Sequence, residues 1–131
     1  MVQIVGLSLS ENSLNCRGVP LEQLSAFKYL QHLDLGLNAL HGPLDVVQPD
    51  LSWSTLSNLQ QLRLFSCGLT GPIGASLSHL PKLRILSLWG NQLRGGFDME
   101  VFRPMVETLT ELDLSSNFFA GSIPLGLGLL R

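Results

Sequence analysis

The ionisable side chains that could take part in chemistry form two short pairs, His32 with Asp34 and Glu111 with Asp113. Carboxyl groups at alternate positions of a strand lie about 7 Å apart, a separation that an inverting glycosidase uses. Any alternate acidic pair on a strand satisfies that geometry, and general acid catalysis needs burial to raise the pKa of one carboxyl. We therefore expect Glu111 and Asp113 to be solvated acids, and we do not expect an enzyme.

Metal, cofactor and nucleotide sites are not expected either. His32 and Asp34 lack the third and fourth ligands that a metal site needs. Cys16 and Cys67 fall at different phases of the sequence pattern described next, which makes a disulfide between them improbable. The chain contains no phosphate-binding Gly-x-x-x-x-Gly-Lys-Ser/Thr loop.

A recurring spacing of apolar residues determines where these side chains lie. The pattern Leu-x-x-Leu-x-Leu-x-x-Asn-x-Leu, with a few substitutions, occupies residues 4–14, 30–40, 59–69, 83–93 and 109–119. Its period of 24 to 29 residues falls in the range of leucine-rich repeats, roughly 20–29 residues. The Leu-x-Leu segment alternates as a strand with one buried face does.

The spacing predicts an α/β-type solenoid. We expect a right-handed leucine-rich repeat coil with a parallel β-sheet on the concave face and short 3-10 or irregular segments on the convex face, because the crossovers are too short for full helices. The whole chain, 1–131, forms one domain in this prediction. Its repeats are 4–29, 30–58, 59–82, 83–108 and the incomplete 109–131.

One position of the pattern is expected to hold the coil together from inside. After each strand the chain turns inward and buries backbone groups that need hydrogen-bond partners. A side-chain amide supplies two donors and an acceptor, so it can bridge its own turn to a neighbouring one. The predicted ladder consists of Asn12, Asn38, Cys67, Asn91 and Asn117. Because a thiol bonds weakly, the turn at Cys67 should be less well satisfied.

Two crossovers depart from the common pattern. The second repeat carries an insertion at 46–53, and we expect the segment from Asp45 to Trp53 to bulge from the convex side or an edge. Trp53 itself is more often buried than exposed in such a setting. In the fourth repeat, residues 97–104 replace the usual Ile-Pro signature.

The remainder of each repeat resembles the plant-specific class of leucine-rich repeats, whose consensus continues Leu-x-Gly-x-Ile-Pro-x-x-Leu-x-x-Leu. Residues 69–83 and 119–130 carry this continuation most clearly. The resemblance covers essentially the whole chain, and it implies a receptor ectodomain, a receptor-like protein or a secreted inhibitor similar to polygalacturonase-inhibiting proteins. It also implies an extracellular or cell-surface location. The chain has no N-x-Ser/Thr glycosylation site and no recognisable signal peptide, so a cytoplasmic location stays open.

The outward side chains of the strands form the candidate binding surface. Phe65 and Trp89 are predicted on neighbouring strands, and clustered exposed aromatic rings are typical of binding hot spots. The alternative is that the two rings merely pack on each other and stabilise the sheet. Asp34 beside Arg63 could form a surface ion pair or a polar contact patch. The candidate binding residues are His32, Asp34, Leu37, Gln61, Arg63, Phe65, Ile85 and Trp89.

These observations favour a module that recognises a protein or peptide. Inhibition of a secreted carbohydrate-degrading enzyme and a structural or oligomerising scaffold, including an ice-surface binder, are the alternatives. A net charge of −2 with scattered basic residues disfavours nucleic acid, and no apolar stretch reaches the length of a membrane span. Terminal repeats without caps would expose apolar surface, so end-to-end self-association is expected.

Overall fold

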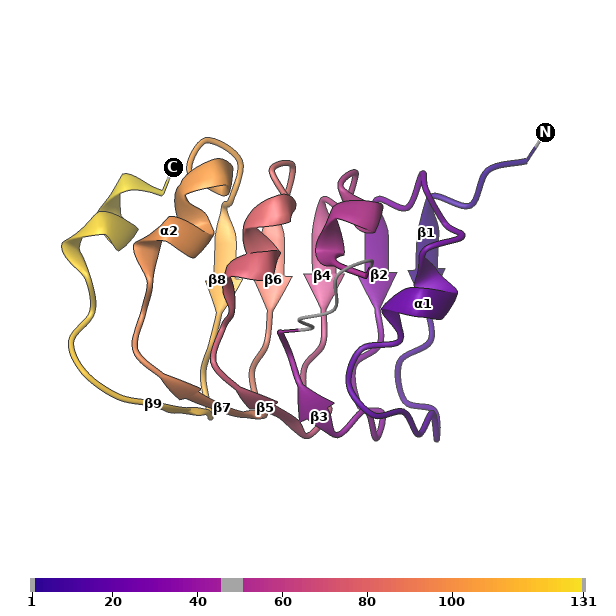
Figure 1. Ribbon diagram of the computed structural model, residues 1–131, viewed down its shortest axis with the longest axis horizontal. Coiled ribbons are helices and arrows are strands. Elements are labelled where there is room, and N and C mark those ends of the chain that lie inside the picture. The colour runs from indigo at the N-terminus through magenta and orange to yellow at the C-terminus, as the bar shows by residue number, and fades with distance from the viewer. Residues whose placement is uncertain (1, 46–50, 131) are drawn as a thin grey trace.

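The chain winds into a stack of five coils, which we call rungs 1 to 5 (Figure 1). This arrangement comes from a computed structural model that describes residues 2–45 and 51–130. Each rung gives one short strand to a five-stranded sheet, in the order of the sequence, and every pairing is parallel. The strands of rungs 1 to 5 are β1 (Gly6–Ser8), β2 (His32–Asp34), β4 (Gln61–Arg63), β6 (Ile85–Ser87) and β8 (Glu111–Asp113).

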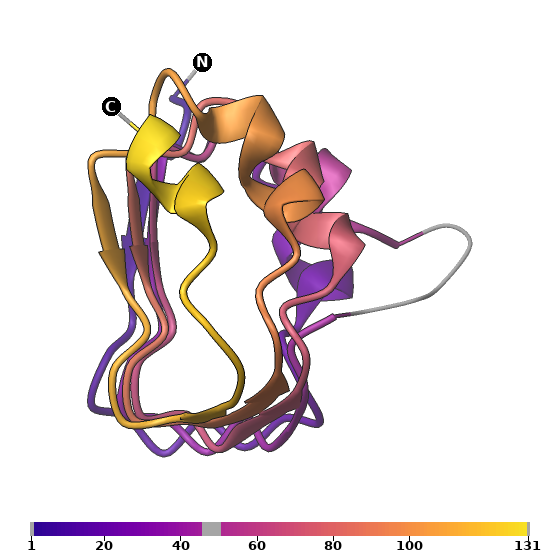
Figure 2. The same cartoon turned by 90° about the vertical axis from the view of Figure 1, so that its left-hand side faces the viewer.

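A second parallel sheet runs along the turn of the coil, at the bottom of the view in Figure 2. The repeat pattern did not predict it. Its strands are only two to four residues long and begin shortly after the asparagine position of rungs 2 to 5. They are β3 (Gly42–Pro43), β5 (Leu69–Gly71), β7 (Gln92–Gly95) and β9 (Phe118–Phe119).

Short helical turns cover the side of the coil opposite the first sheet, except for the last one, drawn in yellow, which lies nearer to that sheet (Figure 2). Among the described residues, four are the expected 3-10 segments and two are single α-helical turns. They are α1 (Leu21–Leu24), η1 (Trp53–Leu56), η2 (Ala75–His79), α2 (Met99–Phe102), η3 (Arg103–Met105) and η4 (Leu125–Leu129). Within the same residues, none of these helices is long and apolar enough to cross a bilayer.

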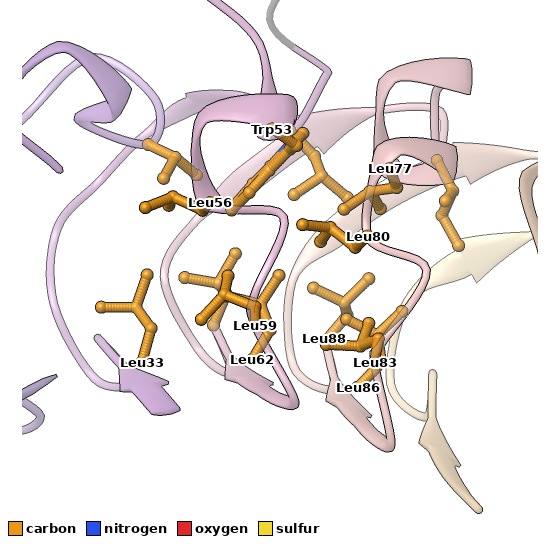
Figure 3. Packing of buried hydrophobic residues seen from close by; sticks show 14 of the residues in the cluster. Leu33, Trp53, Leu56, Leu59, Leu62, Leu77, Leu80, Leu83, Leu86 and Leu88 are labelled. Carbon is orange, nitrogen blue, oxygen red and sulfur yellow. The ribbon is translucent and has the colours of Figure 1, made fainter. Parts of the chain in front are cut away.

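Leucines from both sides of each rung meet in the interior (Figure 3). The central strand residues Leu33, Leu62 and Leu86 are at most 1% exposed and pack toward the leucines of the crossovers. Each buried leucine contributes about 1.5–3 kcal/mol of transfer free energy. Because the core is continuous from rung to rung, stacking itself supplies the stability that no single rung has.

Side chains of the two irregular crossovers are also buried in this core. Trp53 is fully buried beside Leu56 (Figure 3), so the tryptophan is tucked inward as expected. Residues 46–50 of the predicted bulge lie outside the described residues. In the fourth crossover Asp98 caps α2 by accepting a hydrogen bond from the Glu100 N–H (3.0 Å), and Val101 and Phe102 enter the core.

The asparagine side chains form a ladder that joins consecutive rungs. Asn91 is 4% exposed; its Nδ2 donates to the carbonyls of Leu88 (2.8 Å) and Leu64 (2.9 Å), one in its own rung and one in the preceding rung. Its Oδ1 accepts from the backbone N–H groups of Cys67 and Leu69, both at 3.0 Å. Asn38 and Asn117 bond their own and the preceding rung in the same way.

Cys67 takes the asparagine position in rung 3 with a different set of bonds. Its single S–H donor is shared between the carbonyls of Leu35 (3.2 Å from Sγ) and Phe65 (3.3 Å). The Leu40 N–H, whose counterparts in other rungs donate to an asparagine Oδ1, donates instead to the Cys67 backbone carbonyl at 3.1 Å. For this donor the prediction of a less satisfied turn is wrong, because the backbone supplies the acceptor that the thiol lacks.

Burial raises the pKa of the Cys67 thiol, and the charge of Asp34 acts in the same direction. Backbone hydrogen bonds from Asn38 and Leu37 oppose that shift. The thiol therefore stays protonated at neutral pH and fills the asparagine position as a small apolar group with a weak donor. Cys16 and Cys67 are both free.

Removal of one ladder amide should destabilise the chain according to the number of buried groups it leaves without partners. Asn91→Ala leaves two buried N–H groups without an acceptor and removes a donor from two buried carbonyls. We therefore expect the free energy of unfolding to fall by about 2–4 kcal/mol. Urea denaturation followed by circular dichroism measures it.

Asn12→Ala is the matched control. Asn12 is exposed, and its Nδ2 donates only to the carbonyls of Leu9 and Ser10 in its own rung. Its replacement should therefore lower the free energy of unfolding by less than about 1 kcal/mol. Equal losses for the two variants would contradict the ladder as the source of cohesion between rungs.

Candidate binding face

The outward side of the five-stranded sheet presents aligned rows of side chains, one residue from each rung. We call this surface, with the second and third residues after each strand, the sheet face. The strand register aligns Gly6, His32, Gln61, Ile85 and Glu111 in one row, as the spacing predicts. A second row aligns Ser8, Asp34, Arg63, Ser87 and Asp113.

Asp34 and Arg63 are direct partners in the register but form no ion pair, so the first of the two interpretations is wrong and the polar contact patch stays a prediction. The Arg63 Nη1 donates to Gln61 Oε1 at 2.7 Å, two residues away on the same strand face. The Asp34 carboxylate instead turns along its own strand and accepts from the Gly36 N–H at 3.0 Å. Both charged groups thus have local partners. Within 2–45 and 51–130 the structure contains one salt bridge, between the exposed Arg103 and Glu100.

The predicted aromatic pair lies side by side on the sheet face. The rings of Phe65 and Trp89 are parallel to within 7°, with 5.2 Å between their centroids. A stack of this geometry contributes about 0.5–1.5 kcal/mol beyond burial. Phe65 is half-buried, whereas Trp89 keeps 37% of its surface exposed. Stacking and exposure therefore occur together, and the two interpretations made from the sequence are compatible.

Gly36 makes the aromatic stack possible. The Phe65 ring lies directly over it, since a Cβ added at Gly36 would stand 2.4 Å from ring atoms. The absence of a side chain on rung 2 thus creates the hollow that the ring of rung 3 fills. This is a packing reason for a glycine within an otherwise regular row.

Leu37 adjoins the aromatic rings, whereas Ile85 lies four residues before Trp89 on its strand, with Ser87 between them. Leu37 is 41% exposed, and its N–H donates to the Phe65 carbonyl at 2.9 Å. It has a φ of 55°, an unusual backbone conformation for a residue with a branched side chain. Ile85 is half-buried in the row above. Leu37 together with Phe65 and Trp89 gives the middle rungs an apolar centre.

The remaining predicted residues surround this centre with polar groups. His32 extends over Gly6, where an added Cβ would stand 3.9 Å from the imidazole Nδ1. A shallow hollow lies between His32, Asp34 and Arg63 near rung 1. On rung 5, Glu111 is exposed and Asp113 is half-buried on the open sheet face, an arrangement consistent with solvated carboxylates. Across the described residues, His, Cys, Asp and Glu side chains form no group of three that could hold a metal.

A second exposed aromatic group was not predicted from the sequence. On the sheet of β3, β5, β7 and β9, the Arg94 guanidinium carbon lies 5.2 Å from the centre of the Phe118 ring, and Phe118 is 59% exposed. The predicted columns covered only the first sheet. Recognition of a second strand after each asparagine would have placed Arg94 beside Phe118.

Comparison with known proteins connects this geometry to other chains. The family model described as Leucine Rich Repeat matches residues 58–80 and 108–130. An LRR receptor-like serine/threonine-protein kinase of Arabidopsis thaliana, GSO2, is 37% identical over 82 residues, which are 63% of this chain and 6% of that protein.

Two solved structures share the fold over nearly the whole chain. The ectodomain of the Arabidopsis receptor kinase HAESA, in complex with an IDA peptide hormone ligand, is 30% identical with a TM-score of 0.78 and covers 95% of this chain and 20% of that one. A plant ice-binding protein is 29% identical with a TM-score of 0.80, covering 98% of this chain and 39% of that one. The chain thus spans a minor part of the length of each relative.

The hollow over Gly36 gives a direct test of the aromatic stack. Gly36→Ala places a Cβ in the space that Phe65 occupies, so the ring must move and the stack with Trp89 must loosen. Overpacking of this kind lowers the free energy of unfolding by about 1–3 kcal/mol. Near-ultraviolet circular dichroism should lose the signal of the coupled rings.

Gly6→Ala is the control on the same face, because its Cβ finds nothing closer than 3.9 Å. Its stability should change by no more than about 0.5 kcal/mol, with the near-ultraviolet signal intact. An unchanged near-ultraviolet spectrum in Gly36→Ala would refute the predicted dependence of the stack on this glycine.

Proposed function

The chain belongs to the leucine-rich repeat family, of the plant type, and from this premise we propose that it is a recognition module that binds a protein or peptide on its sheet face. The observation that carries the proposal is the stacked pair Phe65 and Trp89 on an open sheet. Rigid rings bury a large area with little loss of conformational entropy. A solvent-exposed pair bordered by polar rows has the composition of a binding hot spot.

The surroundings of the rings support the same proposal. Leu37, with 41% of its surface exposed, extends the apolar centre on one side. His32, Gln61 and Arg63 offer hydrogen-bond donors and acceptors on rungs 2 and 3, and Glu111 and Asp113 offer acceptors on rung 5. The face is long, shallow and open along the stack, a shape that suits an extended peptide better than an enclosed small molecule.

Membership of a receptor or receptor-like protein is part of the proposal. Its support is the similarity to GSO2 and to the HAESA ectodomain, the latter solved with a peptide hormone. We infer an extracellular or cell-surface location on the same grounds. Inhibition of a carbohydrate-degrading enzyme is less well supported, because Arg63 interrupts the acidic residues that an extended acidic contact patch would need.

Ice binding is also less well supported, despite the similarity in fold to a plant ice-binding protein. A surface that matches a lattice needs short side chains repeated from rung to rung. The row of His32, Gln61, Ile85 and Glu111 changes size, charge and polarity at every step.

The two ends of the stack support a proposal of self-association. Ile4 is 49% exposed at the first rung, and Leu125 and Leu129 are 98% and 68% exposed at the last. Contact between the two ends of different copies would cover these apolar groups.

We expect the weight-average mass of the 131-residue chain in sedimentation equilibrium to rise with concentration. A constant monomer mass at millimolar concentration would contradict this expectation.

Replacement of both rings should remove the binding surface without unfolding the chain. We expect peptides selected on the unaltered chain from a random twelve-residue library to bind Phe65→Ala/Trp89→Ala at least about tenfold more weakly, as the loss of a hot spot implies. Isothermal titration calorimetry measures the affinities, and far-ultraviolet circular dichroism checks the fold.

Phe118→Ala is the matched control, since Phe118 is also an exposed aromatic residue but lies on the other sheet. Its affinity for the selected peptides should be unchanged. If the double variant bound as tightly as the unaltered chain, the sheet face would not be the recognition site.

A further inference from the structure

The second sheet differs from the first in the charge of its side chains. In every rung, the six residues that follow the asparagine position include no aspartate or glutamate, although the chain has ten acidic residues. The same segments contain Arg17, His41 and Arg94, and all three side chains are exposed. Glu22 of α1 lines a hollow together with Arg17, but the two form no ion pair. These segments therefore add only positive charge to a chain whose net charge is −2.

Arg17 and His41 lie side by side at one end of this surface. A parallel bridge joins Asn15 to Ala39, and the Gly18 N–H donates to the His41 carbonyl at 2.9 Å. The segment of rung 1 thus runs along the edge of the second sheet in register with rung 2. We call the outward side of β3, β5, β7 and β9, together with Arg17 and His41, the second-sheet face.

Two side chains of the second-sheet face are held flat against the next rung. The His41 imidazole lies over Gly68, where an added Cβ would stand 2.4 Å from the imidazole Nδ1. The Arg94 guanidinium lies over the ring of Phe118, its register partner, with 5.2 Å between the central carbon and the ring centre. Because both groups are already ordered, a ligand would restrict their conformational freedom only slightly.

Neutral hydrogen-bonding groups lie between the two positive ends. Thr70 and Gln92 are register partners on β5 and β7, and neither is buried. Arg17 and Arg94 belong to rungs 1 and 4, and neighbouring strands are about 4.8 Å apart, so the two arginines are separated by about 14 Å along the stack. An extended chain advances about 3.3 Å per residue. Residues four apart on such a chain therefore span nearly the same distance.

This spacing decides which class of anionic partner suits the face. A regular polyanion, such as a sulfated polysaccharide, has a charge on every unit and would place several of them against Thr70 and Gln92, which are neutral. A protein segment can instead place two carboxylates four residues apart, with peptide N–H and C=O groups between them. Arginine is suited to carboxylates because its planar guanidinium donates two parallel hydrogen bonds to them.

We propose that the second-sheet face binds an acidic, extended segment of a protein partner, with one carboxylate on Arg94 and another on Arg17 and His41. Thr70 and Gln92 bond the peptide groups between the two carboxylates. Phe118 acts indirectly, as the ring that orients the Arg94 guanidinium. This surface is separate from the sheet face and goes beyond the recognition role proposed there.

Three acetylated and amidated peptides test the charge and its spacing. They are Glu-Gly-Ser-Gly-Glu, its neutral analogue Gln-Gly-Ser-Gly-Gln, and Glu-Glu-Gly-Ser-Gly, which carries the same charge at adjacent positions. Binding to the 131-residue chain is followed by NMR through the Nε–H signal of Arg94. We expect the first peptide to bind about fivefold more tightly than the other two, with an advantage that falls as salt is added. Equal affinity for the three peptides, or an unmoved Arg94 signal, would overturn the proposal.

Two arginine variants of the same rung separate this site from general electrostatic attraction. Arg94→Gln removes one positive charge from the second-sheet face and should abolish the fivefold difference. Arg84→Gln makes the same change of charge at an exposed arginine directly before β6 of the first sheet, and should leave the difference intact. Equal losses in the two variants would show attraction without a site and overturn the proposal.

Two further measurements settle the partner and the separation of the two surfaces. If heparin bound through Arg94 and the acidic peptides did not, the assignment to a protein segment would be overturned. Arg94→Gln should also leave unchanged the affinity of library peptides that depend on Phe65 and Trp89, because Arg94 lies on the other sheet. A parallel loss of both affinities would contradict a second, separate surface, while the recognition role of the sheet face would stand.

Discussion

The buried turn after each strand of the first sheet is the constraint on which the rest of the structure depends. Its backbone N–H and C=O groups enter an interior of leucine side chains, where water cannot satisfy them. A side-chain amide is small enough for the interior and carries both donors and an acceptor. At Asn91 it bonds groups of two rungs at once, so the requirement for hydrogen bonds in one coil also fixes the position of the next.

Once the position of each rung is fixed, the strand register alone determines where the outward side chains lie. The register of neighbouring strands places each outward residue beside its counterpart in the next rung, about 4.8 Å away. These side chains contribute little to the core, so their identities can differ from rung to rung. The row of Asp34, Arg63, Ser87 and Asp113 shows this freedom. The central residue of each of these strands is a leucine in every case, because its side chain points into the interior.

Sequence reasoning succeeded wherever a feature follows from the repeat period. It placed the strands, the rows of the sheet face, the asparagine positions and the stacked pair Phe65 and Trp89. It failed where local alternatives of similar energy compete. Arg63 reaches Gln61 on its own strand rather than Asp34 across the sheet, because an ion pair between half-buried groups at the surface gains little over a nearby hydrogen bond. The second sheet was missed because strands of two to four residues leave almost no alternating pattern.

The role of Cys67 shows how far such a scaffold tolerates a departure from its own pattern. The thiol replaces the donor function of the amide, and the Cys67 carbonyl takes over as acceptor for the Leu40 N–H. The turn therefore stays intact at rung 3, which is the rung that carries Phe65 and Arg63. Because cohesion between rungs rests on groups inside the coil, a change outside, such as the lack of a side chain at Gly36, can serve the aromatic stack alone. Trp89 thus stacks on Phe65 and still keeps 37% of its surface exposed, so the contacts that stabilise the fold leave part of the same side chain open to solvent.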